Sequence, residues 1–175
     1  MADSFLQVLA RRTVAETPES DREKVFRELH ALIETLTRDA EVRRWLRSAE
    51  SMTQTAVLNK EIFKKLHPTV FLVVQALVEA KRLPEIKKWW KEYLRVLEHA
   101  HAGKEVRLTT VRPLPDKMRL ALQKALEKRF EMPVFLTELL DPSLRGGMTL
   151  TTEDWSLDAS LKGRLTRLTQ ELIDS

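Results

Sequence analysis

Hydrophobic side chains recur every three or four residues through the first hundred residues, a spacing typical of amphipathic helices. A first helix is predicted by the apolar stripe Phe5, Leu6, Leu9 and Ala10, and Thr17-Pro18 should end it. A second helix, which Ser20 and Asp21 are expected to cap, is indicated by a longer set of regularly spaced apolar residues: Val25, Phe26, Leu29, Leu32, Ile33 and Leu36.

Two further helices are predicted before the first strong break. A short one should follow Asp39 and turn Val42, Trp45 and Leu46 inward, and a fourth should run from Ala56 to Leu66 after the polar stretch 51–55. His67-Pro68 then interrupts the pattern, and proline suits the first turn of the next helix.

The segment Thr69 to Ala80 is apolar on nearly every side. A helix of this kind is either central to a bundle or covered by a partner, and the two interpretations are equally open. A sixth helix should open at Pro84, with an inward face that contains Ile86, Trp89, Trp90, Tyr93, Leu94, Val96 and Leu97.

The pattern changes after Gly103. Val106 to Val111 alternates apolar and polar residues, which predicts a strand, and Asp116 to Phe130 has helical spacing. The helix should turn one apolar side to the core: Met118, Leu122, Ala125, Leu126 and Phe130. Further strands are predicted at 134–140, 148–152 and 155–157, followed by a last helix that Ser160 should cap and that runs through Leu161, Leu165, Leu168 and Leu172.

These elements predict a mainly α protein of two parts. Residues 1–103 should form an N-terminal six-helix bundle, and residues 104–175 a small α+β C-terminal module. A chain of 175 residues with 43% hydrophobic and 32% charged side chains can bury a real core. No apolar run approaches the roughly 20 residues that span a bilayer, and the first residues lack an apolar signal core, so a cytoplasmic location is expected.

Charge and candidate chemistry exclude several functions. Without cysteine the chain can form neither disulfides nor thiolate metal sites. The 30 basic and 26 acidic residues are spread along the sequence, so the basic pairs at 43–44, 64–65, 81–82 and 87–88 indicate solvated helix faces more than a phosphate-binding stripe.

No catalytic constellation is evident. His30 is expected at the surface, and His99 and His101 do not share a helix face, so a metal site has no set of ligands. Gly146-Gly147 precedes Met148-Thr149 rather than the lysine and hydroxyl residue of a phosphate-binding loop. No cofactor or metal is therefore expected.

The C-terminal part carries two specific motifs. Asp141-Pro-Ser-Leu-Arg-Gly-Gly-Met and Leu157-Asp-Ala-Ser-Leu-Lys-Gly-Arg-Leu-Thr-Arg-Leu stand in the order and at the spacing of the closing signature of one family. The sequence strongly resembles the delta subunit of bacterial F-type ATP synthases, the family of the oligomycin sensitivity-conferring protein. The segments from Leu77 to Ile86 and from Ala125 to Phe130 are also similar to that family.

The resemblance implies a non-catalytic subunit of the peripheral stalk, or stator. Such subunits join the catalytic head to the stalk and resist the torque of the rotor during proton-driven ATP synthesis. Residues 1–103 are then expected to hold N-terminal helices of the alpha subunits, and residues 104–175 the C-terminal ends of the b-subunit helices. The expected location is the cytoplasmic face of the inner (plasma) membrane, peripheral and without insertion.

Two sets of site residues follow. The expected groove for the alpha-subunit helix is lined by six residues: Phe5, Leu6, Leu9, Val73, Val74 and Leu77. The signature residues are expected to be structural: Asp141, Pro142, Gly146, Gly147, Asp158, Ser160, Gly163 and Arg164. The alternative function is a basic helical nucleic-acid-binding or adaptor protein, which would need a one-sided basic surface.

Overall fold

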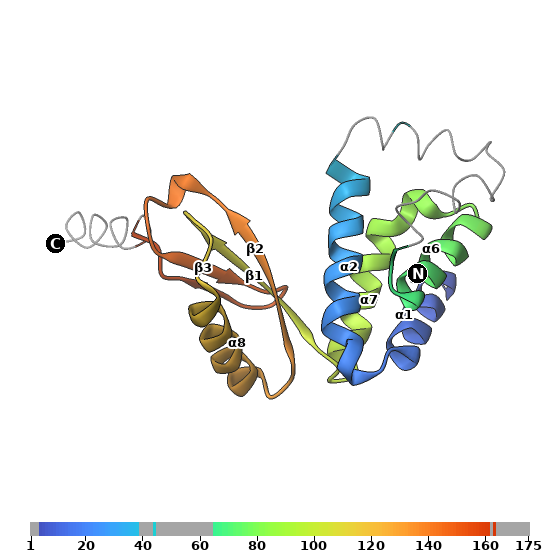
Figure 1. Ribbon diagram of the computed structural model, residues 1–175, viewed down its shortest axis with the longest axis horizontal. Helices are drawn as coiled ribbons and strands as arrows, with labels where there is room; N and C mark the ends of the chain where they lie inside the picture. The colour runs from blue at the N-terminus through green and yellow to red at the C-terminus, as the bar shows by residue number, and fades with distance from the viewer. Residues whose placement is uncertain (1–3, 39–43, 45–64, 162, 164–175) are drawn as a thin grey trace. The chain divides into compact units, whose positions relative to one another are not determined.

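The computed structural model describes residues 4–38, 44, 65–161 and 163. The chain divides into two compact units, Met1–Ala102 (unit 1) and Gly103–Ser175 (unit 2) (Figure 1). The described part is mainly helical, with a small sheet in unit 2.

Unit 1 is built from helices. Its described elements are α1 (Ser4–Glu16), α2 (Glu19–Arg38), α6 (Pro68–Glu79), the 3₁₀ turn η1 (Leu83–Glu85) and α7 (Ile86–His99). Helix α1 packs against both α7 and α6, and α2 packs against α6. The predicted third helix, and nearly all of the predicted fourth, lie outside the described residues, so a six-helix bundle is not confirmed.

Two of three helix starts differ from the prediction, and the third, that of α6, has proline in its first turn as expected. Helix α2 begins at Glu19, so Ser20 and Asp21 lie inside its first turn, and their predicted capping role is wrong. Helix α6 begins at Pro68, and Nδ1 of His67 caps it by accepting a hydrogen bond from the Thr69 amide at 3.3 Å. Pro84 lies in η1 and α7 begins two residues later, because the chain first tightens into a 3₁₀ turn.

Aromatic side chains fill the core of unit 1. The Trp89 and Tyr93 rings of α7 stack at a centroid distance of 5.3 Å, and Phe26 of α2 lies 5.2 Å from Trp90. Burial raises the pKa of Tyr93 far above its usual range. His30 is half-buried beside Phe26 and Trp90, so the surface position expected for it is only partly correct.

Unit 2 is a four-stranded sheet with one helix against it. Its elements are β1 (Lys104–Thr110), α8 (Asp116–Phe130), β2 (Val134–Leu140), the 3₁₀ turn η2 (Pro142–Leu144), β3 (Met148–Thr151) and β4 (Ser156–Asp158). The strand order is β2-β1-β3-β4. Strands β1 and β2 are parallel, since α8 connects them, and the other two pairs are antiparallel.

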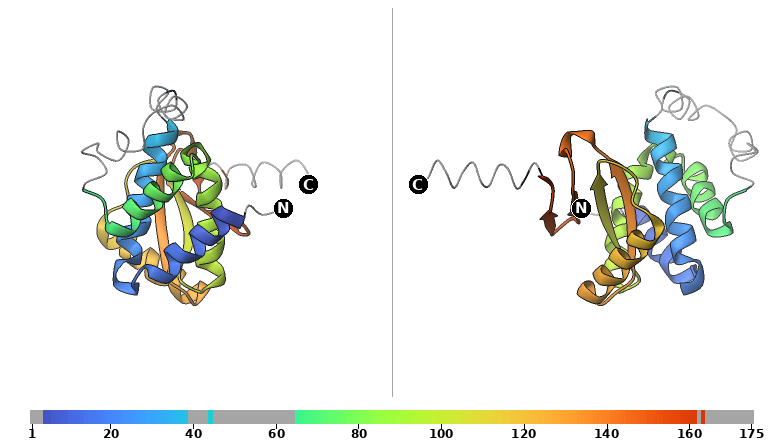
Figure 2. Two further views of the ribbon diagram at one scale, coloured as in Figure 1. Left: turned by 90° about the vertical axis from the view of Figure 1, so that its right-hand side faces the viewer. Right: turned by 60° about the vertical axis from the view of Figure 1, so that its left-hand side comes forward.

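Helix α8 lies along one face of this sheet (Figures 1 and 2). The registers place Val106 beside Leu136 and Leu108 beside Leu150, so alternate apolar residues of three strands share the face that packs on Leu126 of α8. Two residues depart from the predicted inward face of the helix, because Met118 is 59% exposed and Ala125 is exposed as well. Met118 lines a groove instead.

Candidate functional site

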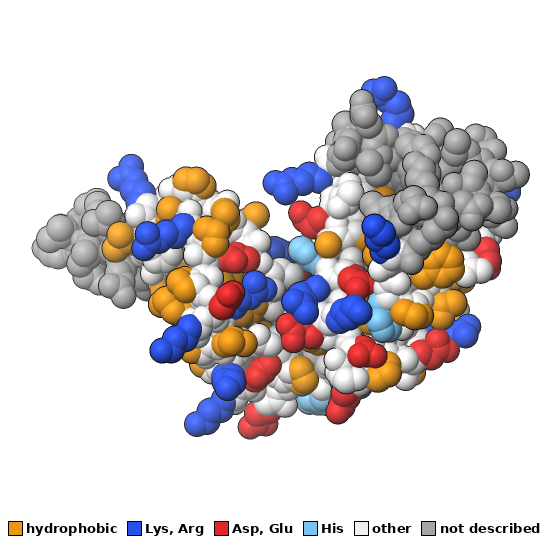
Figure 3. All heavy atoms as spheres, in the orientation of Figure 1, with side chains coloured by type: hydrophobic (Ala, Val, Ile, Leu, Met, Phe, Trp, Pro, Cys, Tyr) orange, Lys and Arg blue, Asp and Glu red, His pale blue; other side chains and the backbone are white. Residues whose placement is uncertain are grey.

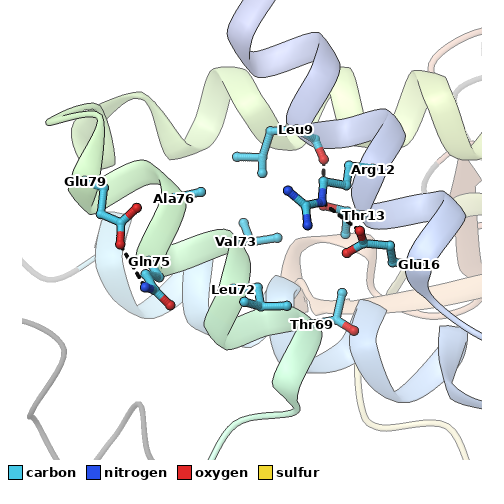
Figure 4. A pocket seen from close by; sticks show the side chains of 10 residues that line it. All are labelled: Leu9, Arg12, Thr13, Glu16, Thr69, Leu72, Val73, Gln75, Ala76 and Glu79. Atoms are coloured by element: carbon cyan, nitrogen blue, oxygen red, sulfur yellow. Dashed lines mark hydrogen bonds and ion pairs between the residues drawn. The ribbon is translucent and has the colours of Figure 1, made fainter.

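A groove lies between α1 and α6 in unit 1. Its volume is about 190 Å³, and ten side chains surround it (Figure 4). We call it the α1–α6 groove, and its lining comes from four residues of α1 and six of α6: Leu9, Arg12, Thr13, Glu16, Thr69, Leu72, Val73, Gln75, Ala76 and Glu79.

The floor of the α1–α6 groove is apolar and its rim is polar. Leu9, Val73 and Ala76 face the space between the two helices (Figure 4). Leu72, on the outer side of α6, is 50% exposed. The rim groups are already paired with each other: the Arg12 guanidinium lies 2.7 Å from Glu16, and the Gln75 amide donates to Glu79 at 2.8 Å.

The structure brings only part of the predicted binding set to this groove. Leu9 and Val73 line it, although Val73 is only 1% exposed, whereas Leu6, Val74 and Leu77 are outside the lining and form the core behind it. Phe5 is half-buried, with the Arg82 guanidinium 5.4 Å above its ring.

Sequence reasoning missed Leu72, the most exposed apolar residue of the lining. Its signal was present, because Leu72 is a large apolar residue on the side of α6 where Gln75 and Glu79 also lie. A helical side shared by such residues faces solvent or a partner, not the core.

A second groove lies in unit 2, where the loop after β1 and the start of α8 face the turn before β3. Its volume is about 790 Å³. We call it the β1–α8 groove, and eleven residues line it: Thr110, Val111, Arg112, Pro113, Leu114, Pro115, Met118, Arg145, Gly146, Gly147 and Met148.

The first signature motif builds one wall of the β1–α8 groove. Asp141 caps η2 by accepting a hydrogen bond from the Ser143 amide at 2.8 Å, and Pro142 occupies the first position of that turn. Gly147 has φ +75°, and a Cβ there would clash with the carbonyl oxygen of Ala159. These contacts fit the structural role predicted for the motif.

The second signature motif begins in β4 and continues into the helical residues Leu161 and Gly163. Ser160 is 1% exposed, and its hydroxyl accepts a hydrogen bond from the Gly163 amide at 2.9 Å, in the manner of an N-cap. Asp158 in turn accepts from the Ser160 amide at 2.8 Å. A Cβ on Gly163 would clash with the Asp158 carboxylate, so glycine allows this close packing. Arg164 lies outside the described residues.

Among the residues that the structure describes, no three histidine or acidic side chains are grouped so that they could hold a metal ion. His99 and His101 are both exposed, at the end of α7 and in the turn after it. Within the same part of the chain, no helix combines the length and hydrophobicity needed to cross a membrane.

Known proteins resemble this chain in sequence. The relatives include ATP synthase delta subunits of Coxiella burnetii (strain RSA 493 / Nine Mile phase I), 36% identical over 115 residues, and of Haemophilus influenzae (strain PittEE), 34% identical over 100 residues. These matches cover 66% and 57% of this chain, and they span 62% and 56% of the relatives' own lengths.

The fold is also similar to a solved structure. A chain in the cryo-EM structure of the Toxoplasma gondii mitochondrial ATP synthase hexamer aligns with a TM-score of 0.54 and 23% identity, and the alignment covers 97% of this chain and 95% of that one. The family model of the ATP synthase delta (OSCP) subunit matches residues 10–172, nearly the whole sequence. The chain therefore belongs to the ATP synthase delta (OSCP) subunit family.

Proposed function

We propose that this chain is a non-catalytic stator subunit of an F-type ATP synthase, which links the catalytic head to the peripheral stalk and resists the torque of the rotor. Membership of the delta (OSCP) family supports this role. The observation that carries it is the α1–α6 groove, an apolar channel between two helices with exposed Leu72 at its edge.

The occupant of this groove is an amphipathic helix from the N-terminus of an alpha subunit. A helix that inserts its apolar side between two others is a common mode of peptide recognition. Here Leu9, Val73 and Leu72 offer the apolar contacts, while the Arg12–Glu16 and Gln75–Glu79 pairs stay at the rim, where water reaches them. Helix α6 is thus covered by core on one side and by the partner on the other.

The remaining parts of the proposal concern the whole assembly. Unit 1 completes a six-helix bundle with helices between α2 and α6, and unit 2 holds the ends of the b-subunit helices. The subunit sits peripherally at the cytoplasmic face of the membrane, as part of the synthase. The isolated chain is expected neither to bind nor to hydrolyse ATP, and calorimetric titration with ATP at micromolar concentrations tests this expectation.

Nucleic-acid binding is less well supported by the charges. Glu85 forms ion pairs with one residue of each of the basic pairs 81–82 and 87–88. Its carboxylate lies 2.9 Å from Arg82 and 3.3 Å from Lys88. These two cations lower the pKa of Glu85, mainly through the hydrogen bond from Arg82. On the face shown in Figure 3, basic and acidic side chains are interspersed, with no one-sided basic surface.

The head contact can be tested with a peptide that copies the N-terminal helix of the alpha subunit from the same organism. Leu9→Glu and Leu72→Glu should each weaken binding by about tenfold to a hundredfold, because a buried leucine contributes about 1.5–3 kcal/mol. Both side chains are partly exposed, so the fold should survive, whereas a charge at fully buried Leu77 would disrupt the core.

A matched control comes from Leu120 of α8, which is 58% exposed and lies outside the groove. Leu120→Glu should leave binding of the alpha peptide unchanged. Folded Leu9→Glu and Leu72→Glu variants, verified by circular dichroism, that bind the peptide as tightly as the original chain would place the contact elsewhere. Retention by nucleic acid instead of the peptide would favour the adaptor function.

A further inference from the structure

The chain enters the sheet of unit 2 at one end and leaves it at the other. Strand β1 begins at Lys104, and β4 runs in the same direction as β1, because the β1–β3 and β3–β4 pairs are both antiparallel. The last residue of β4, Asp158, lies beside Thr149, which in turn lies beside Thr109 near the end of β1. A force between these two points therefore pulls β1 and β4 lengthwise, in opposite directions.

A sheet resists a lengthwise pull better than peeling. The hydrogen bonds of an antiparallel pair are perpendicular to its strands, so sliding one strand along the other strains all of them at once, whereas peeling breaks them one after another. Strand β1 is bonded on both sides, to β2 along its whole length and to β3 from Arg107 to Thr110. Both pairs must break together before β1 can slide out, which raises the barrier that governs forced unfolding.

The first residue of β1 is fixed from three sides. The Lys104 amide donates to the Pro133 carbonyl at 2.9 Å, before β2. Nζ of Lys104 lies 2.9 Å from Asp154 and 5.3 Å from the centre of the Phe130 ring, at the end of α8. Strand β3 reaches β1 only from Arg107 onward, and Asp154, in the turn after β3, extends this connection to Lys104. We call Lys104 with these three partners the entry anchor.

The segment after β4 is fixed at the opposite end of the sheet. The Ala159 amide donates to the Met148 carbonyl at 2.9 Å, and the Leu161 amide donates to the Gly146 carbonyl at 3.0 Å. These bonds keep the register of the β3–β4 pair beyond the end of β4. A Cβ on Gly147 would clash with the Ala159 carbonyl oxygen, so glycine lets the two segments lie this close. We call these five residues the exit anchor.

We propose that unit 2 is a mechanical module, in which tension that enters through Gly103 is resisted lengthwise by β1 and β4 and held at the entry and exit anchors. The peptide bond between Ala102 and Gly103 joins the two units covalently, so tension between them passes into β1. The first signature motif supplies one side of the exit anchor and the second motif the other. The inference rests on the proposed function for the origin of the force, since a stator subunit is held at the head and at the stalk.

The test stretches the full chain in two directions with optical tweezers. The sequence has no cysteine, so two introduced cysteines give defined attachment points. His99→Cys with Ser175→Cys, the lengthwise pair, pulls β1 and β4 in opposite directions. His99→Cys with Glu153→Cys, the peeling pair, pulls the turn between β3 and β4 away from β1, because this turn lies at the end of the sheet where β1 begins. At the same pulling speed, the lengthwise pair should unfold at a force at least about twofold higher.

Leu161→Pro separates the exit anchor from overall stability. It removes the amide that binds the Gly146 carbonyl, at a helical position directly after the cap Ser160, where proline is tolerated. The unfolding force should fall in the lengthwise pair and stay the same in the peeling pair, in which residues after 153 carry no tension. Leu161→Ala keeps the amide and is the matched control, so it should lower the lengthwise force less.

Lys104→Met tests the entry anchor. It removes the ion pair with Asp154 and keeps an unbranched apolar side chain beside Phe130, so the lengthwise unfolding force should fall. Lys117→Met, at an exposed position in the first turn of α8, is the control and should leave this force unchanged.

Two results would overturn the inference. The first is an equal unfolding force for the lengthwise and peeling pairs. The second is a folded Leu161→Pro variant that lowers both forces by the same factor, or neither. If Leu161→Pro does not fold, the comparison of the two pairs decides alone.

The force measurements need no partner, so they can fail separately from the proposed function. Equal forces in a chain that binds the alpha peptide would remove the mechanical role and leave the head contact standing. A high lengthwise force in a chain that does not bind the alpha peptide would support the mechanical role and contradict the head contact.

Discussion

Gly147 is held between two segments of unit 2 with no room for a side chain. Its φ is +75°, and an added Cβ would clash with the Ala159 carbonyl oxygen and lie 2.8 Å from Cα of Ser160. The adjacent hydrogen bond from the Ala159 amide to the Met148 carbonyl, at 2.9 Å, fixes this spacing. Gly147→Ala should therefore lower the free energy of unfolding of unit 2 by about 2 kcal/mol or more, measured by urea denaturation.

The control for this substitution is Arg145→Gly, two residues away in the same turn. Arg145 has a left-handed backbone conformation, which glycine adopts without strain. The substitution should therefore leave the free energy of unfolding unchanged or raise it by up to about 1 kcal/mol. A Gly147→Ala variant that unfolds at the same urea concentration as the original chain would show that the segment around Ala159 can move aside.

Asp154 forms an ion pair with a buried lysine, and this pair makes the stability of the fold depend on pH in acid. Lys104 is 6% exposed, and its Nζ lies 2.9 Å from Asp154. The hydrogen bond from the Thr152 hydroxyl, and then the one from Lys104, lower the pKa of Asp154 below 3.8. Because the folded pKa is the lower one, this stabilisation is present above the unfolded value of about 3.9 and is lost as pH falls through the folded pKa.

The free energy of unfolding of the original chain should fall as the pH drops below about 4, and in the Asp154→Asn variant it should fall less. The difference should not exceed about 1 kcal/mol, because Asp154 is 67% exposed and water screens its charge. Urea unfolding at a series of pH values measures it. Identical acid profiles for the two proteins would show that the Lys104–Asp154 pair contributes no pH dependence.

At the scale of elements, local patterns were most informative in unit 2. The bounds of α8 and β2 are those that the sequence predicts, because Pro115 and Pro133 precede them and the apolar spacing is regular. Strand β1 begins earlier, at Lys104. No local pattern marks a lysine as buried, since its partners Asp154 and Phe130 lie far along the chain.

The α1–α6 groove was only partly predictable for the same reason. Helical spacing identifies which residues are apolar, but the pairing of α1 with α6 is set by contacts that are distant in sequence. Leu6 and Leu9 therefore look equivalent in sequence, yet Leu6 is fully buried and Leu9 lines the groove. Burial of Val74 and Leu77 on the opposite side of α6 leaves Leu72 at the surface.

Helix α8 also protects the edge of the sheet. Strand β2 ends the strand order, and such an edge can pair with another chain. Two α8 side chains one turn apart cover it: the Gln123 amide donates to the Val134 carbonyl at 3.0 Å, and Arg119 to the Leu136 carbonyl at 3.3 Å. The polar stripe that a helix usually turns to solvent is here used to satisfy backbone groups.

A variant with both Arg119→Ala and Gln123→Ala tests this role. Each lost hydrogen bond should lower the free energy of unfolding by about 1 kcal/mol, and the uncovered edge should promote self-association. Urea denaturation and sedimentation velocity measure the two effects. Lys124→Ala, at an exposed neighbouring position, serves as the control. A double variant that is as stable and as monomeric as the control would contradict the role.

At the scale of the whole molecule, the proposed stator role assigns one binding surface to each unit. The α1–α6 groove is made only of unit 1 residues, and the β1–α8 groove only of unit 2 residues. Each surface can therefore be altered without changing the lining of the other. Leu72→Glu should weaken the head contact while sparing the binding of a peptide that copies the C-terminal helix of the b subunit.

The same division predicts that the two units fold independently. Helix α7 ends at His99, and the first residue of unit 2, Gly103, already packs so closely on Phe135 that a Cβ there would clash with the ring. Fragments 1–102 and 103–175 should each give a cooperative urea transition, the first with a purely helical circular dichroism spectrum. Their midpoints should match two transitions of the full chain, because the hydrophobic core of unit 2, as far as the structure describes it, contains no residue of unit 1. A single transition of the full chain, together with fragments that remain unfolded, would mean that each unit needs the other to reach its native state.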